Sequence, residues 1–336
     1  MHRESIVIVT PALADANNGN WQTARRWAGL LRSAYRVRLA ADWTGDSADR
    51  ANGGDALLIA LHARRSAPAV LAWRHAHPTR PLLLALTGTD LYRDIDHDAS
   101  AQRSLVLADA LVVLNQLGAD RLPADCRTKC HVLLQSCASR QTLAHSHRHL
   151  RAVMVGHLRD EKDPQTYFRA VRRLAHRSDI LLDHIGNALS PALGDEASAL
   201  AVSHPNYRWL GGLSHAATRR QIQAAHVLVH PSRMEGGAHV VTEAIRCGTP
   251  VLASRIAGNL GLLGAGYTGT FETGDDAGLA ALLSAARDDP AMLPALRRQT
   301  DLRAPLFSPE AERATLHLLV RQLLAGLPPP QEIAHD

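Results

Sequence analysis

Residues 231–254, PSRMEGGAHVVTEAIRCGTPVLAS, have the pattern of a loop, a helix, a turn and a buried strand. Glu235 lies beside Gly236 and Gly237, where the helix is expected to begin, and Glu243 follows eight residues later. Eight residues of α-helix advance about 12 Å and rotate about 80° beyond whole turns, so both carboxylates can contact one elongated ligand. Carboxylates accept paired hydrogen bonds from neighbouring hydroxyls, and glycines at a helix start let an anion approach backbone N–H groups. The block therefore predicts a site for an anionic ligand that carries hydroxyl groups.

On both sides of this block, short apolar runs alternate with longer amphipathic stretches, which is typical of buried parallel strands joined by helices. The expected strands are residues 5–9, 36–40, 56–61, 81–86, 110–114, 131–134, 152–155, 180–185, 207–210, 226–229 and 250–254. The expected helices are residues 20–33, 67–76, 100–108, 164–176, 196–202, 214–224, 238–247, 276–287 and 309–324, followed by a proline stop at 328–330.

The alternation pauses at residues 139–151, SRQTLAHSHRHLR, which contain no core-forming run and are typical of an interdomain linker. The pattern thus predicts two doubly wound, Rossmann-like α/β domains. Such folds bind ligands at the carboxyl ends of their strands, so we expect a cleft between the two domains.

Composition excludes several classes of protein. The chain has 336 residues, about twice the usual domain length, with 46% hydrophobic and 21% charged residues, which excludes a disordered or fibrous protein. The net charge is +5, but the arginines are scattered and aromatic residues make up only 4%, so we expect no nucleic-acid partner. No apolar run is long enough to cross a bilayer, so no membrane partner is expected. Four cysteines and no secretory signal predict a cytoplasmic protein with reduced thiols.

The block at residues 231–254 resembles the signature of retaining, GT-B-fold glycosyltransferases of family 4. Other landmarks of that family occur in order along nearly the whole chain: TPALADANNGNWQTARRWA at 10–28, LTGTDLYRD at 86–94, VGHLRDEKD at 155–163 and WLGGLSHAATRRQIQAAHVLVHPS at 209–232. The resemblance implies a GT-B protein, with an acceptor-side domain at 1–148 facing a UDP-sugar-binding domain at 149–336 across a cleft. The last helix, about residues 309–324, is a candidate to pack back on the N-terminal domain.

The resemblance also implies roles for particular residues on the UDP-sugar side. Glu243 would bind the ribose of UDP and Glu235 the donor sugar, with Lys162 on the diphosphate. The backbone N–H groups from the glycine pair to the helix start would face the sugar and phosphate: Gly236, Gly237, Ala238 and His239.

The family's phosphate-binding arginine has no direct match. Its position is His157 here, with Arg159 two residues later, and the sequence leaves open which of them carries the second positive charge. We favour Arg159, because a guanidinium stays charged and binds phosphate oxygens bidentately. The catalytic set would then be Lys162, Arg159 and Glu235. Gly19 and Asn20 would approach the phosphates from the other domain.

A narrower resemblance concerns the acceptor. The stretches at 10–28, 86–95 and 230–245 resemble the selenosugar synthases of bacterial selenoneine biosynthesis. The resemblance implies transfer from UDP-N-acetylglucosamine or UDP-glucose to selenophosphate, giving a 1-seleno sugar. Many family members carry a histidine where Thr87 stands. An alcohol acceptor needs help to lose its proton, whereas selenophosphate is already a nucleophile, so this departure is compatible with a selenium acceptor. The expected acceptor-binding residues are Arg25, Arg26, Thr87, Thr89 and Arg233.

Three alternatives stay open: an O-glycosyltransferase acting on a lipid or polysaccharide, a nucleotide-sugar epimerase on the same fold, and a silent sugar-nucleotide-binding protein. Asp94 and Asp96 form a D-x-D sequence, which in another glycosyltransferase fold holds a divalent metal. Here it follows an acceptor-side turn, and Lys162 with a helix N-terminus already neutralises the phosphates. We expect no metal and no other cofactor.

Overall fold

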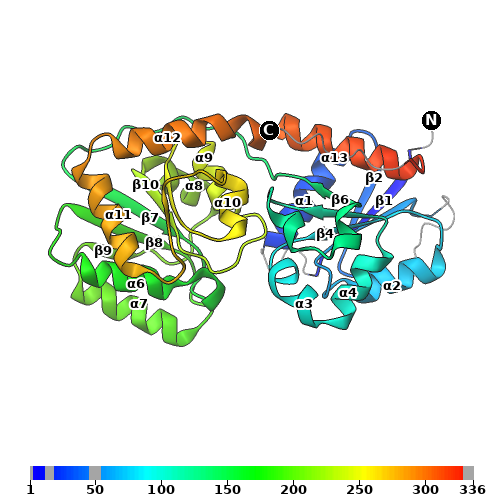
Figure 1. Ribbon diagram of the computed structural model, residues 1–336, viewed down its shortest axis with the longest axis horizontal. Coiled ribbons are helices and arrows are strands. Elements are labelled where there is room, and N and C mark those ends of the chain that lie inside the picture. Colours follow the sequence, from blue (N-terminus) through cyan, green and yellow to red (C-terminus); the bar gives the residue numbers. More distant parts are fainter. Residues whose placement is uncertain (1–2, 12–18, 45–53, 328–336) are drawn as a thin grey trace. The chain divides into compact units, whose positions relative to one another are not determined.

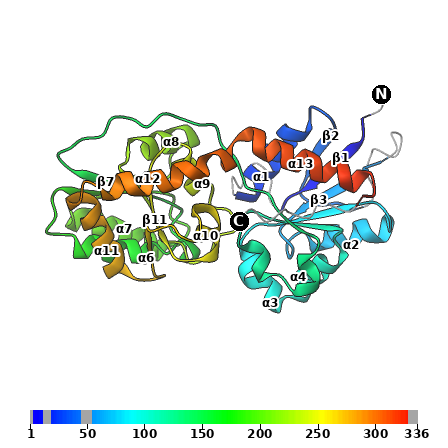
Figure 2. The ribbon, with the colours of Figure 1, turned by 45° about the horizontal axis from the view of Figure 1, so that its top comes forward.

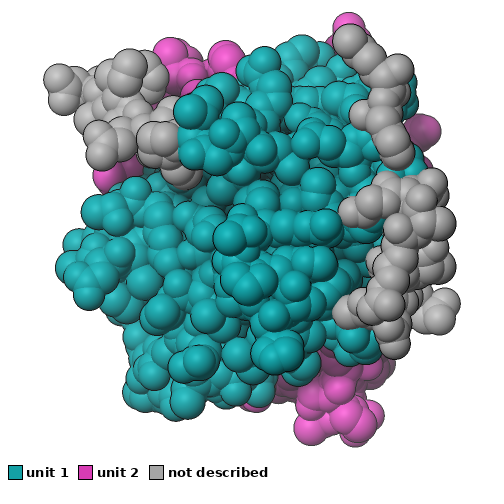
Figure 3. All heavy atoms as spheres, turned by 90° about the vertical axis from the view of Figure 1, so that its right-hand side faces the viewer, with its two compact units in different colours: residues 1–135, 309–336 teal, residues 136–308 magenta. Residues whose placement is uncertain are grey.

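The computed structural model describes residues 3–11, 19–44 and 54–327, and they form two compact units (Figure 1). Unit 1 comprises residues 1–135 and 309–336, and unit 2 comprises residues 136–308, as the colours of Figure 3 distinguish. The sequence predicts a domain boundary between residues 148 and 149, and this boundary stays a prediction. No helix of the described residues is long and apolar enough to cross a membrane.

Unit 1 contains a six-stranded parallel sheet in the order β2-β1-β3-β4-β5-β6. Its strands are β1 (Ser5–Val9), β2 (Arg36–Ala40), β3 (Leu57–Leu61), β4 (Leu82–Leu86), β5 (Ala110–Val113) and β6 (Cys130–Val132). Because β2 and β3 lie on opposite sides of β1, the direction of winding changes between β1 and β3. Such a switch point opens a crevice at the carboxyl ends of the strands.

Helices cover both faces of this sheet. α1 (Gly19–Leu31) and α13 (Pro309–Leu324) pack on one face, where Trp27 and Leu316 join Ile6 and Ile59 in one buried cluster. Figures 1 and 2 show α13 beside α1, although nearly 300 residues separate them in the chain. α2 (Ala67–Ala76) and α4 (Ala99–Leu107) contribute to the cluster on the other face. The chain's last described helix therefore completes the core of unit 1.

Unit 2 contains a second six-stranded parallel sheet, in the order β12-β11-β10-β7-β8-β9. Its strands are β7 (Leu150–Val155), β8 (Ile180–Ile185), β9 (Tyr207–Trp209), β10 (Val227–His230), β11 (Val251–Ser254) and β12 (Thr270–Phe271). Its α-helices are α6 (Pro164–Arg173), α7 (Pro191–Ser203), α8 (His215–Ala224), α9 (His239–Ile245), α10 (Ala257–Leu263), α11 (Asp276–Asp288) and α12 (Met292–Arg303). The switch point of this sheet lies between β7 and β10.

The predicted α/β class is confirmed, and all eleven expected strands are present. The structure adds α10, α12, β12 and two short helices, α3 (Ile95–His97) and α5 (Ala124–Arg127), which the sequence pattern did not predict. α7 begins five residues before the predicted start. The predicted linker at 139–151 holds no helix and only the first two residues of β7. It is bound to unit 2, because Arg140 N–H donates to Arg246 O and Thr142 Oγ1 donates to Cys247 O. The proline stop and residues 12–18 of the first predicted loop lie outside the described residues.

Candidate active site at the switch point of unit 2

The carboxyl ends of β7 and β10 lie side by side at the switch point of unit 2. The two strands pair in parallel, with Met154 opposite Val229. After β7 the chain makes a short 3-10 helix, Asp160–Lys162, and after β10 it makes the loop that contains Glu235. Two segments that are distant in sequence therefore reach the same edge of the sheet, where doubly wound folds bind ligands.

An ion pair joins these two segments. Lys162 Nζ donates to Glu235 Oε1 over 2.5 Å, and the two side chains are only 17% and 11% exposed. His230, the last residue of β10, is buried with its Nε2 3.2 Å from the same oxygen. Burial raises the pKa of the Glu235 carboxyl, but the Lys162 charge and the His230 hydrogen bond more than offset it, so the pKa lies well below its ordinary value. Glu235 is therefore an anion at neutral pH.

A second buried carboxylate lies on α9. Glu243 is 2% exposed, and its Oε1 lies 2.5 Å from His215 Nε2 on α8 and 3.3 Å from His239 Nδ1 one turn earlier on α9. Burial raises its pKa, but the hydrogen bonds from both histidines reverse the effect and lower the pKa to about 2. The Arg219 guanidinium, with Nε 3.8 Å from the same oxygen, adds positive charge. Glu243 is thus an ionised acceptor whose present partners are side chains.

Close backbone approaches fix the loops that carry these residues. A Cβ on Gly258, in α10, would lie 1.9 Å from the carbonyl oxygen of Glu235, so only glycine allows this contact. A Cβ on Gly186, after β8, would lie 2.0 Å from the carbonyl oxygen of Gly156. That same oxygen lies 3.1 Å from Nε2 of His184, a buried residue of β8. The turn after β7 and the loop after β10 are therefore held by packing as well as by the Lys162–Glu235 pair.

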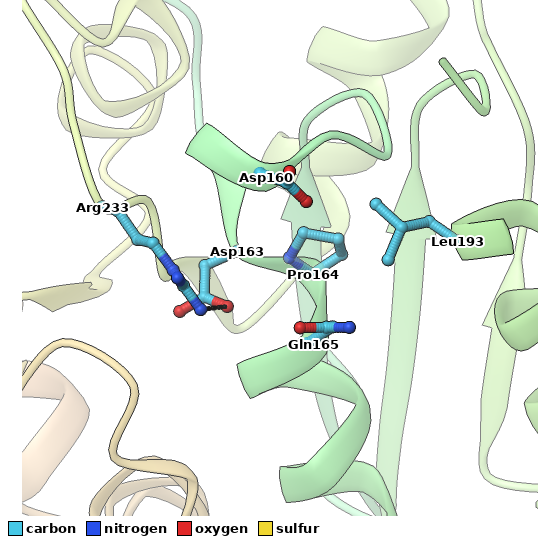
Figure 4. A pocket seen from close by; sticks show the side chains of 6 residues that line it. All are labelled: Asp160, Asp163, Pro164, Gln165, Leu193 and Arg233. Atoms are coloured by element: carbon cyan, nitrogen blue, oxygen red, sulfur yellow. Dashed lines mark hydrogen bonds and ion pairs between the residues drawn. The ribbon is translucent and has the colours of Figure 1, made fainter. Parts of the chain in front are cut away.

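Asp163 and Arg233 tie the same two segments together from another side. Asp163 has a left-handed backbone (φ 45°), is 1% exposed, and accepts from Arg233 over 3.1 Å. Arg233 N–H also donates to Glu161 O over 2.9 Å. Figure 4 shows the arginine directed at Asp163, beside a depression of about 30 Å³ lined by Asp160, Asp163, Pro164, Gln165, Leu193 and Arg233. A volume of about 30 Å³ has room for very few water molecules, so this depression is too small for a nucleotide.

The two candidates for the second phosphate cation differ in charge. His157 Nδ1 accepts a hydrogen bond from Asn187 N–H over 3.1 Å, which a protonated nitrogen could not do. Burial, and then the charges of Arg159 and Lys162, lower the pKa of His157. Arg159 has a side chain that is 46% exposed and, among the residues that the structure describes, forms an ion pair only with Glu161, at 4.0 Å. His157 is therefore a neutral structural residue, and Arg159 keeps an accessible charge.

The predicted residues on unit 1 have varied surroundings. Gly19 and Asn20 open α1, with Gly19 exposed and open space where a Cβ would stand. Arg25 is exposed on α1, whereas Arg26 Nε donates to both oxygens of Glu312 on α13, each at 3.1 Å. The structure thus gives Arg26 a partner inside unit 1, and its predicted role in acceptor binding stays a prediction.

The turn after β4 separates the two predicted threonines. Thr87 N–H and Gly88 N–H both donate to Asp90 Oδ1 over 2.9 Å, and the Thr87 hydroxyl lies 3.5 Å from the same oxygen. Thr89 instead faces His62, with 3.1 Å between Oγ1 and Nε2. Sequence reasoning missed His62, and also His215 and His230 at the site of unit 2. A histidine directly after an apolar run was the available signal for His62 and His230.

One group of described residues could hold a metal ion. His215, His239 and Glu243 each offer one ligand atom, and these atoms lie within 4.8 Å of one another. The nearby Arg219 charge and the N-terminus of α8 disfavour a cation there. The D-x-D residues are engaged elsewhere, because Arg64 and Arg93 donate to Asp94 and Arg121 donates to Asp96. The arrangement suits hydroxyl and anion recognition.

Comparison with solved structures identifies the class of the fold as GT-B. A sucrose-phosphate synthase from Thermosynechococcus elongatus superposes with a TM-score of 0.78 at 17% identity, covering 96% of this chain and 100% of that one. HepE from Anabaena, in complex with UDP and glucose, gives a TM-score of 0.72 at 15% identity, covering 97% and 100%. At these identities the likeness concerns the fold, and it confirms the predicted GT-B architecture.

Sequence comparison gives a family match within unit 2. Residues 138–302, just under half of the chain, match the model of "Glycosyl transferases group 1". A curated relative, "D-inositol 3-phosphate glycosyltransferase 1" from Catenulispora acidiphila, is 43% identical over 76 residues. That stretch spans 22% of this chain and 18% of the relative. The matched family region contains Lys162, Glu235 and Glu243.

Proposed function

We propose that this protein is a glycosyltransferase that takes a UDP-sugar as donor and releases UDP. The observation that carries the proposal is the pair of buried, ionised carboxylates Glu235 and Glu243 at the switch point of unit 2. Both accept hydrogen bonds from side chains that ligand hydroxyls could replace. Glu243 would accept from the ribose and Glu235 from the donor sugar. HepE, whose structure contains UDP and glucose, supports UDP as the nucleotide.

Lys162 and Arg159 would stabilise the diphosphate. As the bond between C1 of the sugar and the phosphate oxygen lengthens, negative charge grows on UDP and the sugar becomes oxocarbenium-like. Cations aimed at the leaving group lower the energy of that state more than that of the bound donor. We assign the second cation to Arg159, because the lowered pKa of His157 and its accepted hydrogen bond leave that ring neutral.

For the acceptor we propose selenophosphate. The supporting observations are the sequence resemblance at 10–28, 86–95 and 230–245 and the threonine at position 87. In the reaction a selenium–C1 bond forms as the C1–O bond to UDP breaks, and UDP leaves with the electron pair. Hydrolysis of the selenium–phosphorus bond, with water as co-reactant and phosphate as the second product, then gives the 1-seleno sugar.

O-glycosyl transfer to an alcohol is the second candidate. The supporting observation is the 76-residue match to a relative named for D-inositol 3-phosphate. An alcohol must lose a proton during attack, so this reaction needs a base that selenophosphate does not need.

One assay separates these functions. Purified protein is mixed with UDP-N-acetylglucosamine or UDP-glucose, with and without selenophosphate, and followed by UDP release and product mass. We expect UDP release that depends on selenophosphate and a product with the mass of a seleno sugar. If the protein transfers sugar to an alcohol but not to selenophosphate, the glycosyltransferase proposal stands and the selenium acceptor is rejected. Epimerised donor without UDP release, or binding without turnover, would reject both.

A further inference from the structure

His62 lies at the switch point of unit 1, directly after β3. Its backbone is left-handed (φ 75°) and its side chain is only 2% exposed. Non-glycine residues rarely adopt this conformation, and among the described residues only His62 and Asp163 have it. Strained residues of this kind persist where the surrounding structure enforces them, and they concentrate at functional sites. Asp163 belongs to the site of unit 2, so His62 marks an equivalent position in unit 1.

The hydrogen bonds of the His62 ring define its tautomer. Arg65 N–H donates to Nδ1 over 3.3 Å, so this nitrogen is an acceptor and the proton of the neutral ring resides on Nε2. Burial lowers the pKa of the ring more than Asp90 and Asp94 raise it, which keeps the ring neutral. Nε2–H therefore donates to Thr89 Oγ1, 3.1 Å away. Because that oxygen accepts from the ring, the hydroxyl proton of Thr89 is free to be donated to a ligand.

A buried carboxylate holds the two loops that carry this pair. Asp90 is 0% exposed and accepts from three backbone N–H groups, those of Ala63, Thr87 and Gly88, each at 2.9 Å. These bonds join the segment after β3 to the turn after β4. The turn continues as a π-helix, Asp90–Asp94, a form that is rare and frequent at functional sites. His62 and Thr89 are thus preorganised.

Charges of both signs lie near the pair, and Asp94 Oδ2 is 3.9 Å from His62 Nε2. Arg64 and Arg93 both donate to Asp94, at 2.8 and 3.2 Å, so this carboxylate is neutralised. Arg65 is exposed, and its guanidinium forms no ion pair with any described residue. The Thr89 hydroxyl is therefore the donor at this position, and the exposed Arg65, three residues after His62, is the candidate cation. The His62 ring is no base here, because its only lone pair already accepts from Arg65 N–H. Burial raises the pKa of Asp94, but the hydrogen bonds from Arg64 and Arg93 bring it below its ordinary value, so Asp94 is a poor base.

We propose that Thr89 and Arg65 form a binding site for a small tetrahedral oxyanion of the phosphate class, with His62 as the positioning residue that orients the Thr89 hydroxyl. Donors without a base match a nucleophile that arrives already ionised, such as a phosphate, thiophosphate or selenophosphate. The binding site itself does not depend on the proposed function. Only the assignment of the bound anion as the acceptor rests on the proposed function.

Binding of inorganic phosphate to the full chain, without donor sugar, tests the site itself. We expect Thr89→Val and His62→Asn each to weaken phosphate binding about ten- to hundredfold in calorimetry, as for one lost hydrogen bond to a charged ligand. Asn tolerates the left-handed backbone. Thr89→Ser restores the hydroxyl and should restore binding. The double variant should lose no more than Thr89→Val, because both changes remove one hydroxyl contact.

Matched controls lie near the amino ends of the unit 1 strands, away from His62 and Thr89. Thr128→Val and His75→Asn change exposed residues of the same types, located before β6 and at the end of α2, and should leave phosphate binding unchanged. The nitrogen-15 resonance of His62 Nε2 should shift when phosphate is added to wild type and stay fixed in Thr89→Val. Equal phosphate affinity in wild type, Thr89→Val and His62→Asn would overturn the proposal, as would no binding in wild type.

Kinetics then separate this site from the proposed function. With selenophosphate as acceptor, Thr89→Val should raise the acceptor KM and leave the donor KM within about twofold. If phosphate binding depends on Thr89 but selenophosphate is no acceptor, the oxyanion site stands and the selenium assignment fails. If selenophosphate is transferred but Thr89→Val and His62→Asn both leave its KM unchanged, the proposed function stands and the oxyanion site fails.

Discussion

The two switch points both hold buried carboxylates, but their partners differ. In unit 2, Glu235 and Glu243 accept from the side chains of Lys162, His215 and His239. In unit 1, Asp90 accepts from three backbone N–H groups. Side chains can rotate away when a ligand's hydroxyls arrive, whereas backbone donors cannot leave without unfolding the turn.

This difference assigns different roles to acidic residues of similar burial. The carboxylates of unit 2 can exchange their partners for ligand hydroxyls, which suits a ribose and a sugar. Asp90 fixes two loops, and the group that we propose meets a ligand there is a donor, the Thr89 hydroxyl. The comparison therefore predicts a donor-sugar edge in unit 2 and an acceptor edge in unit 1.

Replacing Lys162 should have the largest effect. Lys162→Met leaves the Glu235 carboxylate buried without its ammonium, which we expect to cost about 3–5 kcal/mol of unfolding free energy. UDP release should fall by about two to three orders of magnitude, because a cation on the leaving group is lost. Lys129→Met is the matched control, since Lys129, within the described part of the chain, donates only to the carbonyls of Val106 and Ala108 in unit 1. Near-normal turnover in Lys162→Met would show that this lysine does not stabilise the leaving group.

Glu243→Gln should weaken UDP binding by about tenfold to a hundredfold, or about 1.5–3 kcal/mol, because an amide offers one acceptor where the carboxylate offered two. Glu235→Ala should instead reduce turnover more than UDP affinity. Calorimetry with UDP and steady-state UDP release measure the two quantities. Unchanged UDP affinity in Glu243→Gln would reject the ribose assignment.

The depressed pKa of Glu243 also predicts how stability depends on pH. Its pKa falls from 4.5 in the unfolded chain to about 2 in the fold, so the ionised form stabilises the fold above pH 4.5. That contribution, about 3 kcal/mol, is lost as the pH falls through 4.5 toward 2. Unfolding free energies of wild type and Glu243→Gln should therefore converge over this range. A constant difference between them would show that the carboxylate is not held ionised by His215 and His239.

A contrast on α1 sharpens the account of unit 1. Arg26→Ala should lower the unfolding free energy by about 2 kcal/mol, because Glu312 is fully buried and loses its charged partner while keeping the hydrogen bond from Trp27. Arg25→Ala, one residue earlier and exposed, should leave stability within about 0.5 kcal/mol. Chemical denaturation of both variants gives the comparison. Equal stability would show that the Arg26–Glu312 pair contributes little to the core of unit 1.

The smallest effect is expected from metal removal. Lys162 and Arg159 provide charge for the diphosphate, and the D-x-D aspartates are already paired with arginines. Transfer should therefore be unchanged by EDTA. Activity that EDTA abolishes and manganese restores would assign a metal to Asp94 and Asp96 or to the group His215, His239 and Glu243.

The strands could be predicted because their cores are uninterrupted apolar runs, as in Leu57–Leu61 and Ile180–Ile185. α12 was missed because Pro294 interrupts its helical pattern, and α10 because glycines and a lack of charge hide its periodicity. The ion pair between Lys162 and Glu235 was not predicted, because the family motifs assigned each residue to the ligand and 73 residues separate the two.

Hydrogen-bond partners that come together only through the packing of distant elements could not be predicted from the sequence. Arg26 was predicted to bind the acceptor from its place on α1, and its partner Glu312 lies 286 residues away on α13. Nothing in the letters LHARR showed that His62 turns left-handed and points at Thr89, because that depends on β3 lying next to β4. Long-range pairing decides which polar residues serve the fold and which remain for a ligand.

The claim that unit 2 binds the donor and unit 1 binds the acceptor is tested most directly by one set of steady-state kinetic measurements. UDP release is measured over a grid of UDP-sugar and acceptor concentrations for wild type, Glu243→Gln and Thr89→Val. Our account predicts that Glu243→Gln raises the KM for the donor about tenfold or more and leaves the acceptor KM nearly unchanged, with the reverse for Thr89→Val. If both variants raise the same KM, or if each raises both equally, the two switch points do not bind separate substrates and the account is wrong.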